Sequence, residues 1–150
     1  MNADRLLTTT LDKYDNVVMT SAWGEQGLFY NPDSKLARGT YFLTVKDYDS
    51  ENDTASGLDR DGVYRVNFAL RSETYRSLFG EQPPRPAAGE LCETGHDYSR
   101  LDALLPHPTY AWASWVCVLS PSEATVEGLS ALVDDAYELA QERFERQFAA

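Results

Sequence analysis

Runs rich in β-branched and aromatic residues predict five strands along the chain, because such side chains fit a pleated, half-buried surface. The runs cover residues 17–19, 27–30, 40–45, 63–70 and 110–119. The fourth run alternates most clearly, which predicts two faces of different character on its strand. One face carries Tyr64, Val66, Phe68 and Leu70, and the other carries Arg65 and Asn67.

Apolar residues spaced three or four positions apart predict a helix near the start of the chain, over residues 3–14. Asn2 is its expected N-cap, because a side-chain amide oxygen can accept a hydrogen bond from the free backbone N–H groups of the first turn. A second, short helix is expected from Ser72, as its cap, to Phe79, with Gly80 ending it.

A third helix is expected at the end of the chain, where Ser120-Pro121-Ser122-Glu123 has the pattern of a capping box with proline at the first helical position. Gly128 weakens the first turns, so we expect the regular helix to begin after it. Strands with one polar face, interleaved with these helices, favour an α+β fold with an antiparallel sheet over a parallel α/β fold. The length of 150 residues favours a single domain, 1–150.

The composition narrows the classes of protein that the chain can represent. Hydrophobic residues make up 43% of it, which excludes a mostly disordered chain. Lys and Arg number 13 against 24 Asp and Glu, for a net charge of −11. This acidic excess disfavours a nucleic-acid partner, since binding to phosphates depends on clustered Lys and Arg.

The sequence favours a cytoplasmic protein without a membrane partner. No apolar run at the start suits a signal peptide, and no stretch approaches the length of a membrane span. Cys92 and Cys117 lie far apart and lack the spacing of a disulfide framework. We therefore expect both thiols to be free in a reducing compartment.

Two groups of potential metal ligands lack the spacing that a metal site needs. The acidic stretch 47–53 fits neither possible register of a calcium-binding EF-hand loop. Cys92, His96, His107 and Cys117 match no zinc motif. The chain also lacks a nucleophile elbow and a glycine-rich phosphate loop. We expect no metal and no cofactor, and name no catalytic residue.

Glu25 follows Trp23 and Gly24, and a carboxyl group beside a large ring is a candidate acid with a raised pKa. The same tripeptide equally suits a packed ring, a turn and a solvated carboxylate. Both interpretations are compatible with the pattern.

The second face of the predicted sheet collects polar side chains. Alternation places Thr44 and Lys46 on one face of their strand, and Arg65 and Asn67 on one face of theirs. For the strand 110–119, we expect Tyr110, Trp112 and Ser114 on this same surface. The other side, packed beneath the helices, is expected to hold Ala111, Ala113, Trp115, Cys117 and Leu119. Trp115 should therefore be core, and Trp112 surface.

Such a surface suits a groove for an anionic or aromatic small ligand. It equally suits a dimer interface or an ordinary exposed sheet. The candidate ligand-binding residues are Glu25, Lys46, Arg65, Asn67, Tyr110, Trp112 and Ser114.

The segment 107–118, which reads HPTYAWASWVCV, precedes a helix that carries LVDDAYEL at 132–139. Together with WGE at 23–25, LFY at 28–30 and TYFL at 40–43, it resembles the YjbR/MmcQ-like family over nearly the whole chain. The chain is also similar to a smaller group of uncharacterised bacterial proteins, in the settings of END at 51–53 and of Asn67.

The resemblance implies the fold α-β(3)-α-β(2)-α, with an antiparallel sheet covered by helices on one face. It implies a further late strand near residues 90–94, and DNA binding on the basis of the fold. This chain departs from the family where Trp112 and Ser114 stand in place of a common Lys and His. That departure and the acidic charge disfavour DNA.

Taken together, these patterns favour a non-catalytic module that binds a small molecule or a protein partner through its open sheet face. A DNA-binding protein of the YjbR type is the first alternative, and an enzyme of unknown reaction is the second. The oligomeric state is not indicated by the sequence.

Overall fold

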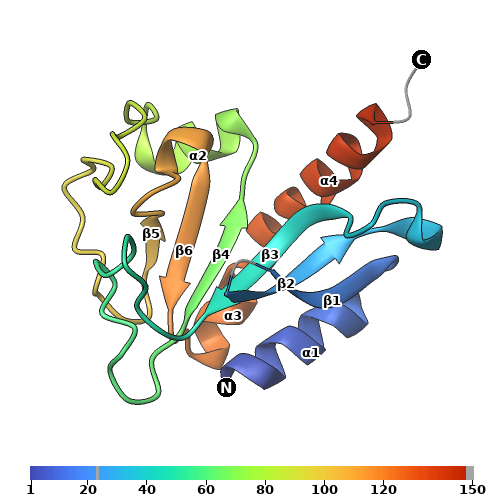
Figure 1. Ribbon diagram of the computed structural model, residues 1–150, viewed down its shortest axis with the longest axis horizontal. Coiled ribbons are helices and arrows are strands. Elements are labelled where there is room, and N and C mark those ends of the chain that lie inside the picture. Colours follow the sequence, from blue (N-terminus) through green and yellow to red (C-terminus); the bar gives the residue numbers. More distant parts are fainter. Residues whose placement is uncertain (23, 148–150) are drawn as a thin grey trace.

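The centre of the molecule is one antiparallel sheet with α-helices packed on it (Figure 1). The computed structural model describes residues 1–22 and 24–147, and within them the sheet has six strands in the order β1-β2-β3-β4-β6-β5. The strands are β1 (Val17–Ala22), β2 (Glu25–Tyr30), β3 (Thr40–Lys46), β4 (Arg65–Ala69), β5 (Leu104–Pro106) and β6 (Trp115–Leu119). The expected α+β class with an antiparallel sheet is confirmed.

The helices are α1 (Ala3–Lys13), α2 (Ser72–Phe79), α3 (Glu123–Gly128) and α4 (Ser130–Arg146). Asn2 caps α1 as expected, since its Oδ1 accepts a hydrogen bond from the Arg5 N–H at 2.9 Å. The last helical segment breaks after Gly128, also as expected, and α4 follows. The N-cap of α3 is Ser122 rather than Ser120, because the Ser122 hydroxyl accepts a hydrogen bond from the Thr125 N–H. Ser72 is the first residue of α2 and not its cap.

One face of the sheet packs against α1 and α4 through a single apolar core. Alternate residues of the central strands point into it, so the expected facing of β4 is confirmed. The core includes Leu6 and Leu7 of α1, Val66 and Phe68 of β4, Val116 and Val118 of β6, and Ala136, Ala140 and Phe144 of α4. Within the described residues, no helix combines the length and apolar character needed to cross a bilayer.

The other face of the sheet is covered by loops instead of helices. On this face, residues of neighbouring strands lie directly opposite one another in the pairs Thr44–Asn67, Lys46–Arg65 and Asn67–Cys117. Residues directly opposite in an antiparallel pair share a face, so these side chains are neighbours. The chain between β3 and β4 folds over part of this face, where Leu58 belongs to a second, smaller apolar cluster with Cys117.

The expected strand over residues 110–119 is wrong in its first half. Ala111–Ala113 forms a short 3₁₀ helix, and Ser114 takes a left-handed backbone conformation with φ 69° before β6 begins. The facing of β6 is also the reverse of the expectation. Trp115 and Cys117 share the loop-covered face with Asn67, since Ala69 pairs with Trp115 and Asn67 with Cys117.

The late strand expected from the resemblance lies elsewhere along the chain. Residues 90–94 form no strand, and the strand that pairs with β6 on the side away from β4 is β5, at Leu104–Pro106. Four strands precede α2, whereas the resemblance implies three. Apart from these differences, the sheet is covered by helices on one face, as expected.

Candidate functional site

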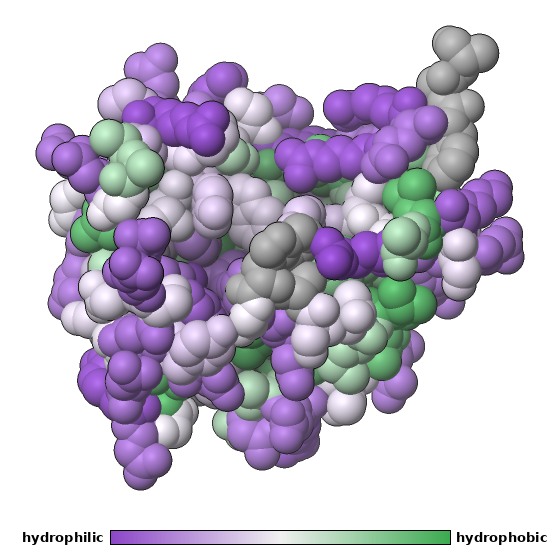
Figure 2. All heavy atoms as spheres, viewed as in Figure 1, coloured by the Kyte–Doolittle hydropathy of each residue, from purple (hydrophilic) through white to green (hydrophobic). Residues whose placement is uncertain are grey.

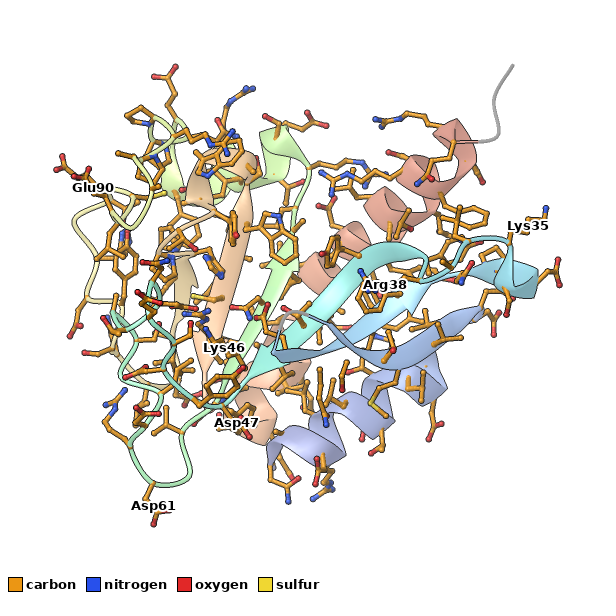
Figure 3. The ribbon with its side chains drawn as sticks, in the orientation of Figure 1. Lys35, Arg38, Lys46, Asp47, Asp61 and Glu90 are labelled. Carbon is orange, nitrogen blue, oxygen red and sulfur yellow. The ribbon has the colours of Figure 1, made fainter. Side chains whose placement is uncertain are left out.

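A cavity of about 590 Å³ lies on the loop-covered face of the sheet. Strands β2, β3, β4 and β6 supply its floor, and the loop after α2 supplies part of its wall. Figure 3 marks Lys46 at the end of β3 and Glu90 in that loop, and both line the cavity. The surface seen in Figure 2, from the same side, is mostly hydrophilic with scattered apolar patches.

Asp53 holds together the two cations of the floor. Its carboxylate accepts two hydrogen bonds from Arg65, at 2.9 and 2.7 Å, and one from Lys46 Nζ at 2.9 Å. Lys46 also donates to the Ser50 hydroxyl, and Arg65 to the Ser56 hydroxyl. Burial alone would raise the pKa of Asp53, but the hydrogen bonds and charge of Arg65, and then of Lys46, hold it well below its usual value.

Asn67 connects this ion pair to Glu25. Arg65 Nε donates to Asn67 Oδ1 at 2.7 Å, and Asn67 Nδ2 donates to Glu25 Oε1 at 3.1 Å. The Thr44 hydroxyl also lies 3.4 Å from that same oxygen. Burial raises the pKa of Glu25, although Arg65 and Lys46 act in the opposite direction. The second carboxylate oxygen of Glu25 makes no hydrogen bond within the described residues.

His107 lines the cavity with only 3% of its surface exposed. Its Nδ1 accepts hydrogen bonds from the backbone N–H groups of Thr109 at 3.1 Å and Tyr110 at 3.2 Å. Because Nδ1 is an acceptor, the proton of the neutral ring is on Nε2. Burial, and then the positive charge of Arg65, holds the pKa of His107 well below its usual value, so the ring stays neutral.

The Nε2–H group of His107 has no partner within the described residues. Among the fully enclosed side-chain nitrogen and oxygen atoms described, the one without a partner is the hydroxyl of Tyr64, which belongs to the core beneath the helices. The unpartnered Nε2–H is therefore not sealed in the protein. It faces the cavity that His107 lines.

Aromatic rings form one side of the cavity. Tyr41 and Trp115 meet edge to face with their centroids 6.0 Å apart, and Tyr110 lies 6.3 Å from Trp115. Tyr41 reaches this face because the register between β2 and β3 shifts, with Leu28 opposite Leu43 but Phe29 opposite Tyr41. Such a bulge re-aims a side chain that regular alternation would place in the core.

Two arginines that also line the cavity have no carboxylate partner in the described residues. The Arg85 guanidinium lies 4.6 Å from the centre of the Trp112 ring. Arg143 comes from the last turns of α4, and burial, together with the like charge of Arg146, lowers its pKa. In a chain with net charge −11, these two arginines give the lining of the cavity a local positive character.

The structure brings six of the seven candidate residues to this cavity: Glu25, Lys46, Arg65, Asn67, Tyr110 and Trp112. Ser114 does not line it, because the Ser114 hydroxyl accepts a hydrogen bond from Gln82 and its backbone is held by Leu70. Trp23, which suggested Glu25 as a candidate, lies outside the described residues. Sequence reasoning missed Tyr41, Asp53, His107 and Trp115 as parts of the site.

The expected core position of Trp115 is wrong, and Trp112, although it lines the cavity, is not a simple surface residue. Trp112 is half-buried and packs against the helix-covered core, with its Nε1 donating to the Thr109 carbonyl at 3.0 Å. Trp115 is half-buried on the cavity side. The turn at Ser114 places the two rings differently from a continuous strand, in which they would simply alternate.

The group of potential zinc ligands is dispersed. Cys117 is enclosed, and burial raises the pKa of its thiol to about 12. His96 is exposed and contacts the Thr94 carbonyl, away from His107. Among the described residues, no three His, Cys, Asp or Glu side chains gather as a metal ion would require.

Comparison with protein families assigns the chain to one family. It matches, over residues 1–149, the family of unknown function DUF6194, and it belongs to that family. No curated protein and no solved structure matches the chain. The match carries no link to the YjbR/MmcQ-like family, so that resemblance stays a prediction.

Proposed function

We propose that the protein is a non-catalytic module that binds a small molecule in the cavity on the loop-covered face of its sheet. The observation that carries the proposal is His107, which is 3% exposed and yet has an unpartnered Nε2–H. Because this Nε2–H is open to the cavity, it offers a hydrogen-bond donor of fixed direction to a molecule bound there.

The cavity also has the usual composition of a ligand site. Its volume of about 590 Å³ lies within the range of small-molecule pockets. Aromatic side chains supply contact area, while a few polar groups with defined directions supply specificity. The polar groups are held from behind, since Asn67 is fixed by Arg65 and His107 by its own turn.

A protein partner would use the same face, but a concave site behind loops suits a small molecule better than a flat docking surface. DNA binding is less well supported, because the cations of the floor, Lys46 and Arg65, are already engaged by Asp53. An enzyme stays the second alternative, with Glu25 as its candidate acid. The proposed setting is a reducing cytoplasm, which the two buried free thiols, Cys92 and Cys117, support.

A thermal-shift screen against metabolites and nucleotides tests the proposal, because a ligand that binds the folded state must raise its melting temperature. Tyr110→Ala should abolish the shifts, since this ring lines the cavity while 52% exposed, and its loss should barely affect folding. Leu78→Ala is the matched control, an exposed residue of α2 away from the cavity.

The proposal fails if no compound shifts the melting temperature, or if the shifts survive Tyr110→Ala. Fluorescence anisotropy with a labelled DNA duplex at about 150 mM salt tests the first alternative, DNA binding. Sub-micromolar, salt-sensitive DNA binding would favour that alternative instead.

A further inference from the structure

We propose that the ligand is a planar heteroaromatic ring that accepts a hydrogen bond from His107 Nε2 and donates one to the free carboxylate oxygen of Glu25. This inference rests on the proposed small-molecule function and names the chemical class of the ligand. Four features of the cavity carry it.

The first feature is the fixed direction of the histidine. Two backbone N–H groups, of Thr109 and Tyr110, point at Nδ1, so that atom has no proton to give. The ring therefore presents a donor, not an acceptor, to the cavity. A ligand atom opposite it must be a carbonyl oxygen or an unprotonated ring nitrogen.

The second feature is the fixed direction of the chain of hydrogen bonds that ends at Glu25. A guanidinium can only donate, so Arg65 Nε determines that the atom of Asn67 facing it is the oxygen. Asn67 consequently turns its N–H₂ group to Glu25 Oε1 and to the Thr44 hydroxyl. The other oxygen of Glu25 is left as an acceptor at the cavity, and it requires an N–H or O–H group from the ligand.

The third feature is the charge balance of the floor. Lys46 and Arg65 contribute two positive charges, and Asp53 and ionised Glu25 contribute two negative charges. The floor therefore has no net charge with which to hold an ionic group. A neutral ring with one hydrogen-bond acceptor and one donor matches this neutral floor. An anionic substituent on the ring could pair with Arg85 or Arg143, which also line the cavity.

The fourth feature is the aromatic side of the cavity. Tyr41, Tyr110 and Trp115 all line it, and their rings are tilted or edge-on to one another rather than stacked in pairs. Stacking on such side chains favours a flat π-system and tolerates many ring types. Hydrogen bonds at the ring edge then decide which flat molecule is retained.

Three neutral probes separate these contributions: 2-quinolone, its N-methyl derivative and quinoline. The first has a carbonyl acceptor and an N–H donor, the second lacks the donor, and the third has only a ring nitrogen. Ligand-observed NMR should show that the wild-type chain binds 2-quinolone at least tenfold more tightly than N-methyl-2-quinolone, because the methylated ring leaves the carboxylate unpaired.

Glu25→Gln replaces the hydrogen-bond acceptor that faces the cavity with a donor and conserves the shape of the side chain. The amide oxygen should keep the bonds from Asn67 and Thr44, so the N–H₂ group would face the cavity in place of an acceptor. The preference for 2-quinolone over its N-methyl derivative should then disappear. Glu127→Gln, an exposed residue of α3 that does not line the cavity, is the matched control and should keep the preference.

His107→Asp removes the donor while conserving the turn, because an ionised carboxylate has no N–H or O–H group. One Asp oxygen can accept from the N–H groups of Thr109 and Tyr110 as Nδ1 does, since Asp forms such turns readily. The affinity of the variant for both quinolones should be about tenfold lower than that of the wild-type chain. If this variant does not fold, the Glu25→Gln result decides alone.

Equal affinity for the two quinolones in the wild-type chain, or a preference that survives Glu25→Gln, overturns the inference. It is also overturned if screened compounds bind in the cavity but 2-quinolone does not, and the proposed function then stands. If neither the probes nor the screened compounds bind, the proposed function itself has failed.

Discussion

The two faces of the central strands are equally enclosed and chemically opposite. Phe68 and Arg65 lie three residues apart on β4, and each has 1% of its surface exposed. Phe68 packs under the helices in an apolar core, whereas Arg65 lies under loops with Asp53, Ser56 and Asn67 around it.

The difference follows from what covers each face. A helix satisfies its own backbone hydrogen bonds, so its inner side can be wholly apolar. The loop after β3 instead brings polar side chains, and Asp53 with Ser50 and Ser56 gives the buried cations their partners. Buried charge requires such partners, so this loop is as much a part of the site as the strands are.

The largest expected effect lies on the helix-covered face. Phe68→Ala should lower the free energy of unfolding by about 3–5 kcal/mol, because it leaves a cavity in a closed core. Urea unfolding curves at pH 7 measure it. Since no titrating group of the network faces Phe68, the loss should be the same at pH 5. A pH-dependent loss would show that the two faces are coupled.

Asp53→Asn should lower the free energy of unfolding by about 3 kcal/mol, because it leaves Arg65 and Lys46 buried without their anion. Asp61→Asn, at the tip of the same loop in Figure 3, is the control and should stay within about 0.5 kcal/mol of wild type. Equal effects would show that the loop contributes no specific partner.

The acid side of the stability curve should change in the same variant. The pKa of Asp53 lies below its ordinary value, so its ionised form stabilises the fold above about pH 4, and this stabilisation is lost as the pH falls further. Asp53→Asn should lack that part of the acid dependence. Urea curves between about pH 2.5 and pH 6 compare the two chains.

The two tryptophans both line the cavity but differ in their contact with the helix-covered core. Trp112→Ala should reduce stability by about 2–3 kcal/mol, because the ring contacts the helix-covered core and bonds the Thr109 carbonyl. Trp115→Ala should reduce it by only about 1–2 kcal/mol, since Trp115, unlike Trp112, does not pack against the helix-covered core. The reverse order would restore the facing that the sequence alone suggested.

The smallest effect is expected for Glu25→Gln, measured without ligand. Burial raises the pKa of Glu25, so the ionised group opposes folding at neutral pH, and this opposition fades as the pH falls toward the ordinary value near 4.5. The groups that act on it are Arg65, Lys46, Asp53 and the Thr44 hydroxyl. The variant should be slightly more stable than wild type at pH 7 and no more stable at pH 4. A loss of stability at pH 7 would mean that the two cations dominate.

The facing of β4 could be predicted because its two sides differ in residue type, with Val66 and Phe68 against Arg65 and Asn67. The facing of β6 could not, because Trp115 and Cys117 are as apolar as Val116 and Val118. A strand enclosed on both sides shows no alternation. The left-handed turn at Ser114 further breaks the continuity that the pattern assumed.

The missed site residues depend on long-range geometry. Asp53 is one of several acids in its loop, and its meeting with Arg65 follows only from the path of that loop. Tyr41 reaches the cavity through a bulge, which a one-residue change of register produces without a composition signal. The segment His107-Pro108-Thr109 did offer a clue, since a histidine just before a turn can accept its backbone N–H groups.

The order of strands has a consequence for how the molecule assembles. β1 to β4 pair with their neighbours in sequence, so this meander can form early and locally. β6 joins β4 only across the segment that contains α2 and β5, and closing such a long stretch of chain is slow. Glu25 and Asn67 belong to the early part and His107 and Trp115 to the late one, so the cavity is completed by the last major pairing. In pulse-labelling during refolding, the amide protons between β2 and β3 should accordingly become protected before those between β4 and β6.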